Sequence, residues 1–234
     1  MSKNIVLTGA SSGIGLATAQ KLAKAGHRLA LIARSGDKLK KLAEKLPGKH
    51  LVFPTDLCQV GQVDQTVKEL LERWQNIDVL INNAGVGYFA PFEEGELDHW
   101  MRTFDLNVKA VLQLIHGLLP NLLTNKGHII NIASVAAHEV FPGSVVYCAS
   151  KHALHAITVG MRKEFRDRIK VTDISPGAVE TEFIEQTTHP GKKEEMKDYF
   201  VDVIRPEDVA NEIKHVLDQP NHMVINEIVL RPNR

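Results

Sequence analysis

The stretch Thr8-Gly9-Ala10-Ser11-Ser12-Gly13-Ile14-Gly15 decides the fold of this chain. It follows a short apolar run at residues 5–7 and opens a helical pattern that starts at Ile14. Small residues at such a turn let the backbone approach a pyrophosphate, and the positive end of the helix dipole favours its negative charge. The spacing is G-x-x-x-G-x-G, and the alternative interpretation is a tight turn that needs positive φ. The strand before the glycines and the helix after them favour a dinucleotide site.

Short apolar runs alternate with helical patterns along the rest of the chain. We expect strands at residues 5–7, 29–32, 51–53, 79–81, 128–132, 170–174 and 224–230. Helical patterns begin at residue 14 and cover residues 37–46, 60–74, 97–123, 146–166 and 206–217. Strands that are apolar throughout and separated by helices predict a parallel sheet with both faces covered. We therefore expect one α/β domain over residues 1–234, a Rossmann-type doubly wound sheet of seven parallel strands with helices on both faces.

Composition excludes several classes of protein. The 234 residues carry 28 acidic and 28 basic side chains, so no bulk attraction to nucleic acid or to an anionic membrane is expected. We see no signal peptide and no apolar run long enough to span a bilayer, which predicts a cytoplasmic protein. Cys58 and Cys148 are the only cysteines, and the 11 histidines show no metal-ligand spacing, so no metal site is expected.

The residue after the second predicted strand bears on the choice of nicotinamide cofactor. NAD-binding folds usually place a carboxylate there to hold the ribose hydroxyls. Here residues 29–32 are followed by Ala33-Arg34-Ser35, without an acid. Arg34 would pair with a 2′-phosphate through its planar guanidinium, or it is a solvated surface arginine. The missing acid favours NADP(H).

Tyr147 and Lys151 lie four residues apart on a predicted helix, so both project from one face. A phenol is a poor acid or base at neutral pH, and a nearby ammonium lowers its pKa. Such a pair suits proton transfer to an alkoxide, although most pairs with this spacing are a solvated helix face. Ser134 closes the fifth strand and would hydrogen-bond a substrate oxygen or cap a turn. Asn107 lies inside a long helical pattern, either as solvated surface or as a distortion that serves a site.

Taken together these residues form a signature, and the chain resembles the short-chain dehydrogenase/reductase family over essentially its full length. Asn107, Ser134, Tyr147 and Lys151 match the family's catalytic tetrad in order and spacing. The resemblance implies that the following residues bind the cofactor: Gly9, Ser11, Ser12, Gly13, Ile14, Gly15, Arg34, Asp56, Leu57, Asn82, Ala84, Gly85, Tyr147, Lys151, Pro176, Gly177, Val179 and Thr181.

The resemblance also implies a mechanism. NADPH gives hydride to a carbonyl carbon, Tyr147 donates the proton and Ser134 holds the developing oxyanion. Lys151 binds the nicotinamide ribose and lowers the pKa of Tyr147, and Asn107 supports a water that connects Lys151 to solvent. The expected substrate is a small carbonyl compound or alcohol.

Further expectations concern specificity and assembly. The family's substrate lid falls on residues 180–203, which are polar and lack a firm period. Phe183 and His138 are candidate substrate contacts beside Ser134, with a surface histidine as the alternative for His138. Lys192-Lys193 would recruit an acid or form a solvated charge run. The chain's ending resembles the branch of NADP-dependent 3-hydroxy-acid (serine-type) dehydrogenases and carbonyl reductases, and the family implies a homodimer or homotetramer.

Two other functions stay open at this point. One is a non-catalytic dinucleotide sensor that keeps the fold without the reaction. The other is an NAD-dependent alcohol dehydrogenase, which depends on the role of Arg34.

Overall fold

The computed structural model describes residues 2–199 and 201–233. The expected domain also includes residues 1, 200 and 234, which lie outside the described residues. Residue 200 belongs to the segment predicted as a lid.

The centre of the fold is one sheet of seven parallel strands in the order β3-β2-β1-β4-β5-β6-β7. The strands are β1 (Asn4–Thr8), β2 (Arg28–Ala33), β3 (Leu51–Pro54), β4 (Val79–Asn82), β5 (His128–Ile132), β6 (Lys170–Pro176) and β7 (Glu227–Leu230). The predicted doubly wound fold is confirmed.

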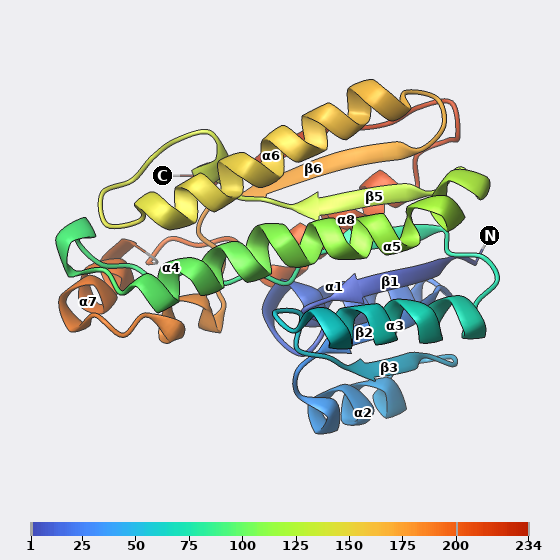
Figure 1. Ribbon diagram of the computed structural model, residues 1–234, viewed down its shortest axis with the longest axis horizontal. Coiled ribbons are helices and arrows are strands. Elements are labelled where there is room, and N and C mark those ends of the chain that lie inside the picture. The colour runs from blue at the N-terminus through green and yellow to red at the C-terminus, as the bar shows by residue number, and fades with distance from the viewer. Residues whose placement is uncertain (1, 200, 234) are drawn as a thin grey trace.

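Helices cover both faces of the sheet (Figure 1). The helices are α1 (Gly13–Lys24), α2 (Gly36–Lys45), α3 (Val60–Arg73), α4 (Leu97–Phe104), α5 (Ala110–Thr124), α6 (Val145–Phe165), α7 (Pro190–Tyr199) and α8 (Pro206–Leu217). Helices α3, α5 and α6 pack on one face, and α1, α2 and α8 pack on the other. Strand β1 shows why: Val6 enters the first core, while Ile5 and Leu7 enter the second, because side chains alternate along a strand.

Two predicted elements differ from the structure. The last strand begins at Glu227 and not at residue 224. Before it begins, the Thr172 hydroxyl donates a hydrogen bond to the Ile225 carbonyl at 2.6 Å, so that carbonyl is bonded to a side chain and not to a neighbouring strand's backbone. The segment predicted as a substrate lid is partly helical: a 3-10 turn, η4 (Glu182–Gln186), precedes α7. Helix α7 is polar and carries four charged residues in its first seven, which is why no apolar period predicted it.

The predicted helix at residues 97–123 is one continuous helix, Leu97–Thr124, with a π-helical segment η2 (Asp105–Lys109) between α4 and α5. It has 28 residues and contains an 18-residue window with a mean hydropathy of 1.2, so by length and composition alone it could cross a membrane, contrary to the expectation that no apolar run is long enough. In the fold it packs against α3 and α6, so much of its apolar surface belongs to the core over the sheet.

The glycine turn is held in place by the segment that follows β4. Gly9 and Gly13 adopt φ of +67° and +50°, and a Cβ on Gly15 would stand 2.1 Å from the Gly9 carbonyl oxygen. The Thr8 hydroxyl accepts the backbone N–H groups of Asn83 and Ala84, each at 2.9 Å. The turn therefore needs glycine for its shape and a hydroxyl for its attachment to the centre of the sheet.

We expect Thr8→Val to lower the free energy of unfolding by about 1–3 kcal/mol, because the isosteric methyl leaves two backbone donors without an acceptor. Urea denaturation measures this change. Thr124→Val is the matched control, since its hydroxyl is exposed and bonds only the Pro120 carbonyl at the end of α5. Equal losses in the two variants would show that the attachment is not important.

Candidate active site

A cleft of two adjoining cavities lies beyond the carboxyl ends of the strands. One has a volume of about 530 Å³ and the other about 360 Å³. They share these lining residues: Ile14, Asn83, Gly85, Thr181 and Phe183. We call the larger the phosphate-side cavity and the smaller the Tyr147 cavity. The sharing of walls makes them one continuous path from the glycine turn to Tyr147.

The phosphate-side cavity gathers residues from the ends of β1, β2, β3 and β4. Eleven predicted cofactor residues line it: Gly9, Ser11, Ser12, Gly13, Ile14, Arg34, Asp56, Leu57, Ala84, Gly85 and Thr181. The N-terminus of α1 faces this space with no acidic residue in its first turn, and the hydroxyl of its N-cap, Ser12, makes no capping hydrogen bond. The helix dipole and the free hydroxyl are therefore available to an anion.

Three cationic side chains line this cavity. Arg34 was predicted, and Lys38 and Arg102 were not. Lys38 lies on α2, which begins two residues after Arg34, so its helix position was the only signal that could have found it. Arg102 comes from α4, far along the sequence, and no local pattern marks it. The Asp56 carboxylate is already engaged as the acceptor of the Cys58 backbone N–H at 3.0 Å.

Two predicted cofactor residues do not line the cleft. Gly15 lies beneath Gly9, where its missing side chain permits the turn. Asn82 is buried, and its amide donates to Asn131 at 2.8 Å across neighbouring strands. The next residue, Asn83, lines both cavities instead and donates to the Thr8 carbonyl at 2.9 Å. Asn83 was not among the predicted cofactor residues; it faces the cleft where Asn82 does not, because successive residues at a strand end face opposite sides.

The Tyr147 cavity holds three of the four predicted catalytic residues. Ser134, Tyr147 and Lys151 all line it. Four predicted nicotinamide-side residues join them: Pro176, Gly177, Val179 and Thr181. Ser134 follows β5, and Tyr147 and Lys151 lie on adjacent turns of α6, so the sheet and one helix fix the arrangement.

Tyr147 is the predicted proton donor of this cavity. Burial raises the pKa of Tyr147 to about 12, against the hydrogen bond with Ser134, which lowers it. The pKa of Tyr147 is therefore raised, whereas the resemblance implied that Lys151 lowers it. The reason is geometric: the Lys151 ammonium donates to the Ile132 carbonyl at 2.9 Å and stands 5.9 Å from the centre of the Tyr147 ring.

Lys151 is buried, and burial lowers its pKa to about 8, while Asp173 acts in the opposite direction. Gly85 lies beside it, since a Cβ there would stand 3.6 Å from the Lys151 ammonium and 3.3 Å from the Asn107 carbonyl oxygen. The absence of a side chain at Gly85 thus keeps the space in front of Lys151 open.

Asn107 lies behind the cavity wall and does not line it. Its side chain is 1% exposed, accepts the Val86 N–H at 2.9 Å and donates to the Val86 carbonyl at 2.8 Å and to Ser150 at 3.0 Å. It sits in the π-helical segment, so the structure agrees with the distortion and not with solvated surface. Such π segments occur often at functional sites.

Of the two candidate substrate contacts, one lines the Tyr147 cavity and the other does not. Phe183 lines the cavity and packs against Tyr147, with ring centroids 5.5 Å apart. His138 does not line it, because its imidazole turns toward Ser175 and Glu227 on β6 and β7. The lid lysines are both paired: Lys192 lines the cavity but bonds Glu195, and Lys193 bonds Glu185.

The lining of the phosphate-side cavity fits a dinucleotide. Gly13 leaves open a space in which a Cβ would stand 3.0 Å from Thr181. Backbone at the start of a helix, free hydroxyls and cationic side chains are the donor set that a pyrophosphate requires.

Comparison with known proteins agrees with this geometry. The family model described as "short chain dehydrogenase" matches residues 3–191. An uncharacterized oxidoreductase of Staphylococcus saprophyticus is 38% identical over 99% of this chain and 96% of its own length. A second, from Staphylococcus aureus, is 36% identical over 98% of this chain and 97% of its own.

Solved structures show the same fold. An alcohol dehydrogenase from the archaeon Thermococcus sibiricus, complexed with 5-hydroxy-NADP, aligns with a TM-score of 0.89 at 28% identity over 99% of this chain and 97% of its own. The closed form of a serine dehydrogenase complexed with NADP+ aligns with a TM-score of 0.90 at 28% identity over 97% of this chain and 93% of its own. The fold, the cleft and the match of the family model together establish that the chain belongs to the short-chain dehydrogenase family.

Proposed function

We propose that this protein is an NADP(H)-dependent oxidoreductase that acts on the CH–OH group of a small secondary alcohol, or on the corresponding carbonyl, with Tyr147 as general acid and base. The observation that carries the proposal is the continuity of the cleft, which runs from the glycine turn to Ser134, Tyr147 and Lys151. A dinucleotide bound along it extends from Arg34 to Tyr147.

Four residues have separate roles in the proposed reaction. When bound, the nicotinamide supplies or takes up the hydride. Ser134 hydrogen-bonds the substrate oxygen, and the Tyr147 hydroxyl gives that oxygen its proton during reduction and takes it back during oxidation. Lys151 holds the nicotinamide ribose, and Asn107 fixes the π segment behind it, where it supports a water that connects Lys151 to solvent.

Cofactor preference follows from charge at the end of β2. Arg34, Lys38 and Arg102 line the phosphate-side cavity, and the residues directly after β2, Arg34 and Ser35, include no carboxylate. Guanidinium groups bind phosphate in a bidentate manner, so this set favours the 2′-phosphate of NADP(H). The two solved relatives above were complexed with NADP+ and with 5-hydroxy-NADP.

The substrate we propose is predominantly apolar. Beyond the catalytic groups, apolar side chains line the Tyr147 cavity: Phe89, Ile132, Phe141, Pro142, Val179, Phe183 and Met196. Lys192 is the one lid cation among the lining residues, and Glu195 neutralises it. A ketone with an apolar group therefore fits better than a free acid such as a 3-hydroxy acid.

A homodimer or homotetramer is part of this proposal. A groove between α3 on one side and the end of α4, η2 and the start of α5 on the other exposes apolar side chains that include Leu71, Phe104 and Leu112. Exposed apolar patches of this kind mark interaction surfaces.

We expect Tyr147→Phe to lower kcat for carbonyl reduction by about 10²–10⁴-fold while NADPH still binds, because only the proton donor is removed. Steady-state rates with a panel of apolar ketones and NADPH fluorescence titration measure the two quantities. Tyr88→Phe is the control, since Tyr88 stacks on His99 and lines neither cavity. A wild type that binds NADPH and is as inert as Tyr147→Phe across the panel would favour the non-catalytic sensor.

We expect Arg34→Ala to weaken NADPH binding by about 10–100-fold and to leave NADH binding nearly unchanged, because the lost hydrogen bonds are those to the 2′-phosphate. Dissociation constants for both cofactors test this. Arg28→Ala is the matched control, since Arg28 starts the same strand at its opposite end and lies over Trp74. Equal losses for NADPH and NADH would favour the NAD-dependent alcohol dehydrogenase.

The pH dependence should differ between the two directions. With a pKa of about 12, Tyr147 keeps its proton at neutral pH, which is the form that reduction requires. Oxidation requires the Tyr147 phenolate, whose fraction rises about tenfold per pH unit below that pKa, while the protonated fraction stays nearly constant. The ratio of the reduction rate to the oxidation rate should therefore fall from about pH 7 to about pH 10. Initial rates at saturating substrates measure it, and a ratio that rises with pH would contradict the role of Tyr147.

A further inference from the structure

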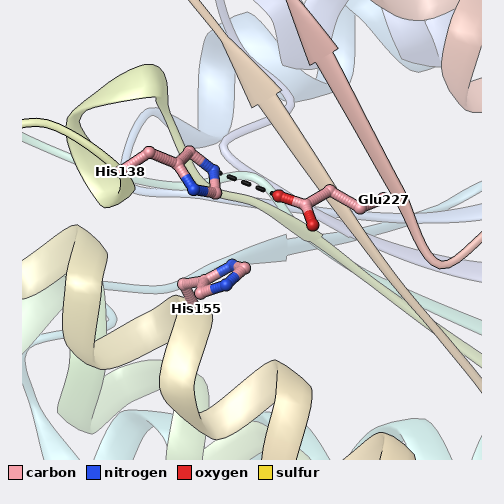
Figure 2. Close-up of side chains that lie close together, drawn as sticks. All are labelled: His138, His155 and Glu227. Atoms are coloured by element: carbon pink, nitrogen blue, oxygen red, sulfur yellow. Dashed lines mark ion pairs between the residues drawn. The ribbon is translucent and has the colours of Figure 1, made fainter.

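Three side chains that can bind a metal converge at the edge of the sheet, outside the cleft. They are His138, which follows the 3-10 turn η3 (Val135–Ala137), His155 on α6 and Glu227 at the start of β7. One ligand atom from each lies within 4.8 Å of the other two. Figure 2 shows that the three side chains point toward one another from three separate elements.

The two nearest of these groups are already in contact. The His138 Nε2 atom lies 3.1 Å from a Glu227 carboxylate oxygen and 3.2 Å from the Ser175 hydroxyl (Figure 2 marks the first contact). The imidazole rings of His138 and His155 have centroids 4.8 Å apart at an interplanar angle of 71°. The rings therefore meet edge to face.

A buried carboxylate orients the second histidine. The His155 Nδ1 atom lies 3.2 Å from Asp173 Oδ2, and Asp173 is fully buried. The other oxygen of Asp173 accepts the Ser175 hydroxyl at 2.8 Å. A carboxylate at this distance holds the proton on Nδ1 and leaves Nε2 with its lone pair. This is the carboxylate–histidine arrangement that usually stands behind a metal-binding imidazole.

We propose that His138, His155 and Glu227 form a binding site for a divalent transition-metal ion of the zinc type, with Asp173 orienting His155. Two imidazole nitrogens and one carboxylate oxygen are a donor set typical of zinc. Donor atoms around a tetrahedral zinc ion lie about 3.3 Å apart. The His138 and Glu227 atoms are 3.1 Å apart, and the His155 atom lies within 4.8 Å of both. All three side chains are partly exposed, so a fourth position faces solvent.

The surrounding charges favour a cation. Glu227 and the buried Asp173 bring two carboxylates to the site. The nearby guanidinium of Arg231 forms an ion pair with Glu139, the residue after His138. A bound dication would offset the two carboxylates.

The site would join three parts of the fold that do not share a backbone ladder. His138 follows the turn that starts at Ser134, and His155 lies one helical turn beyond Lys151 on α6. Glu227 starts β7, the edge strand of the sheet. We therefore assign the metal a structural role, which fixes the catalytic end of α6 against the edge of the sheet. No sequence motif predicted this metal site, because 16 residues separate the two histidines and the carboxylate comes from the last strand.

Zinc binding to the full-length protein tests this proposal without reference to activity. Protein treated with EDTA and exchanged into buffer is titrated with Zn²⁺ against a chromophoric chelator, and separately with Co²⁺ to follow its visible absorption. We expect one equivalent to bind to the wild type, and we expect binding at least about tenfold weaker in His155→Gln and in Glu227→Gln. His152→Gln is the matched control, because His152 is exposed on the same helix and its Nδ1 bonds the Cys148 carbonyl at 2.9 Å.

Thermal unfolding gives an independent second readout. Added Zn²⁺ should raise the Tm of the wild type and of His152→Gln, and it should leave the Tm of His155→Gln unchanged, because a ligand that binds only the folded state stabilises it. Circular dichroism checks that the variants are folded. A wild type that binds no more Zn²⁺ than the double variant of His138→Gln and His155→Gln would overturn the proposal, as would an equal loss in His152→Gln.

Discussion

The attachment of the glycine turn to the end of β4 is the contact on which the site depends. The Thr8 hydroxyl accepts two backbone donors from the following segment, and Asn83 returns a hydrogen bond to the Thr8 carbonyl. Gly85, two residues further, lies between Asn107 and the Lys151 ammonium. One short segment thus connects the glycine turn to Lys151, and a shift of either end would separate the two cavities of the cleft.

Burial opposes charge at the centre of the cleft. It raises the pKa of Tyr147 and lowers that of Lys151, so both side chains are driven toward their neutral forms. Partners compensate in part: Ser134 lowers the pKa of Tyr147, and Asp173 raises that of Lys151. The same Asp173 also holds His155, so one buried carboxylate links the lysine to the proposed metal site.

Sequence reasoning predicted the fold and most of the cleft because their signals are local. Glycines at fixed spacing, apolar strands and the Tyr147–Lys151 pair each need only neighbouring residues. Sequence reasoning failed for side chains whose position is set by contacts between distant parts of the chain. Arg102 reaches the cleft from a helix that no motif marks, and His138 turns away from Ser134 because β6 and β7 offer it polar partners. The direction of the Tyr147 pKa could not be predicted either, because it depends on where the Lys151 ammonium points.

The central claim is that one cleft positions a nicotinamide beside Tyr147, and a crystal structure of the protein with NADP+ and an apolar alcohol tests it most directly. The account predicts the 2′-phosphate against Arg34, the pyrophosphate over the glycine turn, and the reacting carbon of the alcohol between C4 of the nicotinamide ring and the Tyr147 hydroxyl. A nicotinamide ring bound away from the Tyr147 cavity, with the alcohol beyond reach of Ser134 and Tyr147, would contradict it.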